Sequence, residues 1–78
     1  MAENKKNVRN VRMKAVRINN GNLTQKQAAA KMGFTTQYYS RVERGMIAGC
    51  IDFWRHFAEA FQIPDSIVWE IINNKSEV

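Results

Sequence analysis

Three glycines spaced twelve residues apart divide the 78-residue chain into short segments. They are Gly21, Gly33 and Gly45. Glycine is the residue that most readily ends a helix, because it adopts the left-handed backbone conformation without a steric penalty. The spacing therefore predicts short helices joined by tight turns.

Apolar periodicity and capping residues predict five helices and no strand. The expected ranges are about 8–19, 24–33, 35–44, 52–62 and 65–72. In the first, we expect one apolar face made of Val8, Val11, Ala15 and Ile18. In the last, Asp65 or Ser66 is expected to cap the helix after Pro64.

Only three residues join the second and third predicted helices. Thr24 is the expected cap of the second helix, because Gln27 follows it at the three-residue spacing of a capping box. Thr35 is the expected cap of the third helix. The link Gly33-Phe34-Thr35 permits nothing but a sharp corner, which is the geometry of a helix-turn-helix. The residues expected to pack this corner are Ala28, Ala29, Met32, Phe34, Tyr39 and Val42.

The third predicted helix has a polar outer face. Its members fall at helical spacing and are Thr36, Gln37, Ser40, Arg41 and Arg44. Glutamine can pair bidentately with adenine and arginine with guanine, so this face suits the base edges of DNA.

Charge is segregated along the chain. Residues 1–44 hold ten basic and two acidic side chains, a net charge of +8, whereas residues 45–78 hold two basic and five acidic ones, a net charge of −3. A concentrated positive charge predicts a phosphate-binding face. An ordinary solvated basic surface is the alternative.

Other site classes find little support. With one cysteine and one histidine, neither an internal disulfide nor a structural zinc site can form. Cys50 and His56 would point to different sides of a helix, so no catalytic group is predicted. We expect a cytoplasmic protein that is not an enzyme, with no cofactor, metal, small-molecule ligand or membrane segment.

The stretch LTQKQAAAKMGFTTQYYSRVERG, residues 23–45, resembles the helix-turn-helix of the Cro and phage-repressor type, also called the XRE family. The resemblance extends over residues 8–72 and implies an all-α, compact five-helix phage-repressor-like domain. We therefore expect a domain at 8–73 between a flexible basic arm, 1–7, and a polar tail, 74–78.

The resemblance also implies roles for individual residues. Thr36, Gln37 and Arg41 match base-contacting positions, and Arg17 and Glu43 match a structural ion pair. The expected contacts to the DNA backbone are Thr24, Gln25, Tyr38, Ser40 and Arg44, together with Lys5 and Lys6 of the arm. Tyr39 departs from the pattern, which usually has an aliphatic residue there, and its hydroxyl must find a partner or reach solvent.

These features predict a sequence-specific regulator that binds double-stranded DNA with a recognition helix at about Thr36–Arg44. Its partner is expected to be a palindromic operator bound by a homodimer. The alternative is a protein-interaction module, antitoxin-like or otherwise partner-binding, built on the same scaffold. Phe53 and Trp69 lie off the main apolar stripes, so they are the expected self-association or partner surface.

Overall fold

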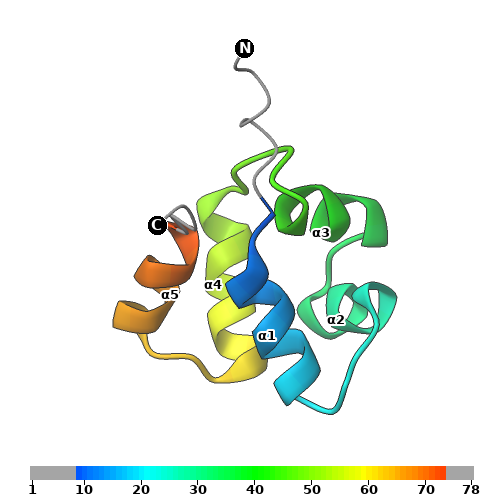
Figure 1. Ribbon diagram of the computed structural model, residues 1–78, viewed down its shortest axis with the longest axis horizontal. Coiled ribbons are helices and arrows are strands. Elements are labelled where there is room, and N and C mark those ends of the chain that lie inside the picture. Colours follow the sequence, from blue (N-terminus) through cyan, green and yellow to red (C-terminus); the bar gives the residue numbers. More distant parts are fainter. Residues whose placement is uncertain (1–8, 74–78) are drawn as a thin grey trace.

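The computed structural model describes residues 9–73, which form five α-helices and no strand. The helices are α1 (Val11–Asn19), α2 (Gln25–Met32), α3 (Thr36–Glu43), α4 (Ile51–Phe61) and α5 (Asp65–Ile72). In Figure 1, α2 and α3 lie on one side of α4 and α5 lies on the other, with α1 packed on α3. The predicted all-α, five-helix fold is confirmed. No helix in this part of the chain is long and apolar enough to cross a membrane.

Local hydrogen bonds explain where the helices begin. Asn10 caps α1, because its side-chain oxygen accepts a hydrogen bond from the Met13 amide at 3.1 Å. The helix therefore starts three residues later than the sequence predicts. The expected side-chain cap of α5 is wrong: the chain enters that helix through Pro64, whose fixed φ suits this position, and Asp65 lies in the first turn.

The buried face of α1 differs from the predicted one. Met13 and Arg17 are buried, whereas Val11 and Ile18 are exposed, and Val8 lies outside the described residues. The rotation has a physical reason. It turns Arg17 toward a carboxylate on α3, and a buried ion pair constrains the helix more strongly than partial burial of two aliphatic side chains.

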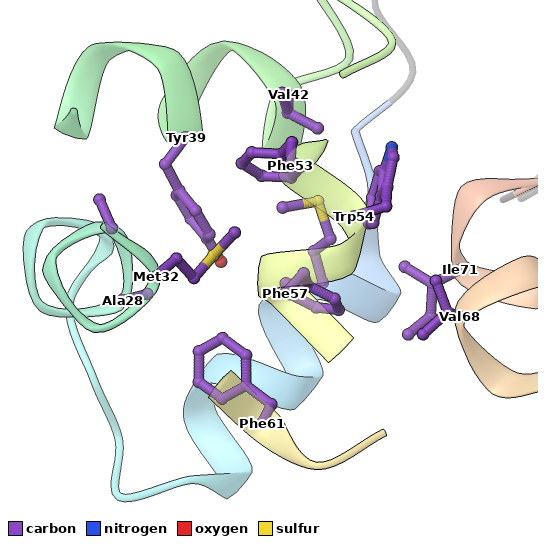
Figure 2. Packing of buried hydrophobic residues seen from close by; sticks show 12 residues of the cluster. Ala28, Met32, Tyr39, Val42, Phe53, Trp54, Phe57, Phe61, Val68 and Ile71 are labelled. Atoms are coloured by element: carbon purple, nitrogen blue, oxygen red, sulfur yellow. The ribbon is translucent and has the colours of Figure 1, made fainter. Parts of the chain in front are cut away.

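Aromatic side chains of α4 form the centre of the core. Figure 2 shows Phe53, Trp54 and Phe57 pointing inward from α4, with Tyr39 reaching in from α3. Phe53 is 0% exposed, so the prediction that it belongs to an interaction surface is wrong. The helix-turn-helix covers it: the Phe34 ring meets Phe53 edge-on with centroids 5.2 Å apart.

Two glycines with similar backbone conformations provide a test of this packing. Gly33 has φ +81° and open space around its Cα, whereas a Cβ on Gly49, at φ +85°, would lie 3.0 Å from the Trp54 indole nitrogen. We expect Gly33→Ala to lower the free energy of unfolding by about 1–2 kcal/mol, the cost of a left-handed alanine. Gly49→Ala should cost more, because Trp54 must also move. Urea denaturation measures both, and equal losses would contradict the crowding at Gly49.

Candidate nucleic-acid interface

The corner between α2 and α3 is held by its own backbone and caps. Gly33 ends α2 in the left-handed conformation, and the Phe34 amide donates back to the Ala29 carbonyl at 3.0 Å. The next residue, Thr35, caps the start of α3: its hydroxyl accepts a hydrogen bond from the Tyr38 amide at 3.1 Å. These bonds satisfy groups that a helix end otherwise leaves unpaired, so the angle between the helices is well determined.

This corner brings most of the expected DNA-contacting residues to one place. A shallow hollow of about 370 Å³ opens over the outer face of α3. Its lining consists of Gln25, Thr36, Gln37, Ser40, Arg41, Arg44 and Met46. All three expected base-contacting residues are in this set, and all three are exposed. Amide, hydroxyl and guanidinium groups therefore converge on a single open surface.

The remaining expected backbone contacts are placed differently. Tyr38 is half-buried, stacks on Phe34 and accepts a hydrogen bond from the Cys50 amide at 3.0 Å. The Thr24 hydroxyl accepts from the Gln27 amide at 3.1 Å, as the capping box requires. Lys5 and Lys6 lie outside the described residues. Neither Tyr38 nor Thr24 lines the hollow.

Met46 was missed by the sequence reasoning. It is exposed and lines the hollow beside the polar residues of α3. Its position directly after Gly45, where the chain turns back along the end of the helix, was the available signal. An apolar side chain at this point can make van der Waals contact with the C5-methyl group of a thymine. Such a contact distinguishes thymine from the other bases.

The part of the chain that builds the hollow has no exposed acidic residue. Between residues 9 and 50 the only acidic residue is Glu43, which is buried. The exposed basic residues of this stretch are Arg9, Arg12, Lys14, Lys26, Lys31, Arg41 and Arg44. An ordinary protein surface mixes both signs, so this part of the molecule is a strongly positive surface.

Glu43 is buried in an ion pair with Arg17. The guanidinium donates through Nε to Oε1 at 3.1 Å and through Nη2 to Oε2 at 2.8 Å, a two-point contact between α1 and α3. Arg17 also donates to the Leu23 carbonyl at 2.8 Å, and Gln25 donates to Glu43 Oε2 at 3.0 Å. The pair thus joins the first three helices and holds the side chain of Gln25 at the edge of the hollow.

The ion pair shifts the pKa values of both partners. Burial alone would raise the pKa of Glu43, but the hydrogen bonds from Arg17 and Gln25 more than offset it and leave that pKa below its ordinary value. The hydrogen bond to Glu43 raises the pKa of Arg17 despite its burial. Both side chains are therefore charged at neutral pH.

Tyr39 lies against this pair. Its side chain is fully buried, and its hydroxyl has no hydrogen-bond partner of normal geometry in the structure. Burial raises the pKa of Tyr39, and the neighbouring Glu43 charge adds to the shift. The hydroxyl therefore stays protonated and lies beside the Glu43 carboxylate, away from solvent and without a hydrogen bond of normal geometry.

Loss of the buried ion pair should be visible in the pH dependence of stability. Because the pKa of folded Glu43 lies below its unfolded value, its contribution is present above about pH 4.5 and is lost as the pH falls further. We expect Glu43→Gln to lower the free energy of unfolding at pH 7 by about 3–5 kcal/mol. The variant should also lose less stability on acidification than the parent.

A matched control is available on the surface. Glu70 forms an exposed ion pair with Arg12 at 3.3 Å, so Glu70→Gln makes the same chemical change outside the core. Urea denaturation between pH 3 and pH 7 compares the two variants. We expect Glu70→Gln to cost no more than about 1 kcal/mol. Similar losses of stability in both variants would show that the buried ion pair contributes no more to stability than the exposed one.

Two tyrosine substitutions test the unsatisfied hydroxyl. Tyr39→Phe removes a buried hydroxyl that makes no hydrogen bond of normal geometry, so we expect the free energy of unfolding to stay level or rise by up to about 1 kcal/mol. Tyr38→Phe removes the acceptor of the Cys50 amide and should lower it by about 0.5–1.5 kcal/mol. Thermal and urea unfolding measure both variants, and a loss of stability in Tyr39→Phe would contradict the assignment.

Comparison with known proteins gives one family match. Residues 13–48 match the family model described as Helix-turn-helix. This range contains the ion pair, the corner and every residue that lines the hollow. No curated protein and no solved structure matches the chain significantly. Residues 13–48 therefore form a helix-turn-helix, and the match supports the resemblance to the Cro and phage-repressor type.

Proposed function

We propose that this protein is a sequence-specific regulator of transcription that binds double-stranded DNA with α3 in the major groove. The observation that carries the proposal is the convergence of Gln37 and Arg41 on one exposed hollow, in a surface that has no exposed acid between residues 9 and 50. Attraction to phosphates supplies affinity, and base-edge hydrogen bonds supply sequence preference.

The dimensions of α3 support this assignment. An α-helix with its side chains is about 10–12 Å across, which fits the roughly 12 Å width of the major groove of B-DNA. Thr36, Gln37 and Arg41 are the proposed base contacts, since they present hydroxyl, amide and guanidinium groups on the exposed side. Met46 is a proposed apolar contact at the rim.

Phosphate contacts are proposed on both sides of these residues. Gln25 and Ser40 line the same hollow, and Arg44 donates to the Ser40 hydroxyl at 3.3 Å, which holds its guanidinium over the end of α3. Thr24 and Tyr38 are weaker candidates, because neither lines the hollow and Tyr38 is half-buried. Lys5 and Lys6 are proposed to add sequence-independent contacts from the N-terminal arm.

We further propose a repressor-like role in the cytoplasm, on a palindromic operator bound by two copies. A two-fold protein dimer places two recognition helices in successive major grooves, so the half-sites are about one helical turn apart. Regulation then follows from occupancy of the operator.

Selection of bound sites from random duplex DNA tests the function. We expect an enriched palindrome for the parent protein and a loss of preference at particular base pairs in Gln37→Ala and Arg41→Ala, worth about 1–3 kcal/mol each. Arg12→Ala is the matched control for Arg41→Ala, because it removes the same charge from a side chain that pairs with Glu70 on α5, away from the hollow. Unchanged base preferences in both hollow variants would refute the assignment of α3.

A further inference from the structure

Backbone hydrogen bonds fix the position of Met46 relative to α3. Gly45, with φ +81°, follows the end of the helix, and its amide donates to the Val42 carbonyl at 3.1 Å. The Met46 amide donates to the Arg41 carbonyl at 2.8 Å. These two bonds are those of the Schellman motif, which ties the residue after the glycine to the helix residue five positions before it. The backbone of Met46 is therefore held directly against that of Arg41.

The side chain of Met46 is left open by this cap. An apolar residue at this position of a Schellman motif frequently packs against the last turns of its own helix. Met46 is instead 53% exposed and lines the hollow over α3, where the other described residues of the lining are polar or charged. An apolar side chain is thus presented at a fixed place within a polar binding surface.

This arrangement requires an apolar group at the matching place on the ligand. Base edges in the major groove present hydrogen-bond donors and acceptors, and the C5-methyl group of thymine is the apolar feature among them. 5-Methylcytosine carries the same methyl group on the same ring atom. The methionine side chain is flexible and polarizable, so it can adapt its contact to such a small group.

We propose that Arg41 and Met46 act as one unit that recognises two neighbouring base pairs. Arg41 donates two hydrogen bonds to a guanine, and Met46 contacts the C5-methyl group of a pyrimidine in the adjacent base pair. Consecutive base pairs are only about 3.4 Å apart, so two residues joined through their backbones reach both at once. The unit accepts thymine and 5-methylcytosine alike, because Met46 contacts the methyl group alone. This assignment rests on the proposed DNA binding and adds the base step that the end of α3 selects.

Removal of single methyl groups from the DNA tests the unit. In the site enriched by selection, each thymine is replaced in turn by uracil, which lacks only the C5-methyl group. We expect the parent protein to lose about fourfold in affinity at one thymine, the effect of withdrawing one methyl group from an apolar contact. That thymine should lie next to the guanine whose preference is lost in Arg41→Ala. Met46→Ala should bind thymine and uracil there equally well.

Cytosine and 5-methylcytosine provide the second arm. Both are placed at the same position, opposite guanine, and they share every hydrogen-bonding group, so the comparison isolates the methyl group. We expect the parent protein to bind the 5-methylcytosine duplex about fourfold more tightly than the cytosine duplex. Met46→Ala should not distinguish the two. Fluorescence anisotropy at one fixed salt concentration measures all of these affinities.

Ile47→Ala is the matched control. Ile47 follows Met46 directly and is 36% exposed, but it lines a separate cavity with Val42 and Trp54 rather than the hollow. We expect this variant to keep the full response to uracil and to 5-methylcytosine. Met46→Leu retains an apolar side chain and should keep most of the response. Circular dichroism checks that each variant keeps the helical fold.

Four results overturn the proposal while leaving the assignment of α3 to DNA in place. They are indifference of the parent to uracil at every thymine, a methyl preference that survives in Met46→Ala, a methyl-sensitive thymine that is not beside the guanine of Arg41, and 5-methylcytosine that binds no better than cytosine. An equal loss of affinity for all sequences in Met46→Ala, with the methyl preference unchanged, would place Met46 against the DNA backbone instead. If selection enriches no sequence at all, the proposed function fails and this assignment fails with it.

Discussion

The buried ion pair of Arg17 and Glu43 is the interaction on which the rest of the arrangement depends. It joins α1 to α3 through two hydrogen bonds, and its charged atoms also bond to the Leu23 carbonyl and to Gln25. A buried charge is costly without a partner in good geometry, so burial of either side chain requires α1 and α3 to be packed together. One side chain from each of the first three helices is thereby held in a single cluster.

The position of α3 follows from this cluster together with the corner before it. Glu43 holds the C-terminal end of the helix, while Gly33 and the Thr35 cap set the start. Phe34 and Tyr38 pack this helix onto Phe53 of α4. With both ends and the inner face occupied, the remaining face is open to solvent, and its polar residues are presented on a rigid support. Rigid placement of this kind is what base-edge recognition requires.

Much of the fold was accessible from local sequence. The capping box of Thr24 and Gln27, the glycine at the end of α2 and the three-residue link each act over a few residues, so their chemistry can be read without knowing the rest of the chain. Two predictions failed for a shared reason. The buried face of α1 and the burial of Phe53 depend on which element packs opposite, and apolar periodicity carries no information about the partner.

The sequence by itself determined five short helices, the sharp corner between the second and third, and the polar character of the outer face of α3, because caps, glycines and helical spacing operate within one or two turns. Only the tertiary structure decided which way α1 faces, that Met46 lies beside the polar residues of α3, and that Ile51 rather than Phe53 is exposed along with Trp69. These features arise from contacts between residues far apart in the chain. Long-range packing therefore selects among faces that local rules leave equivalent.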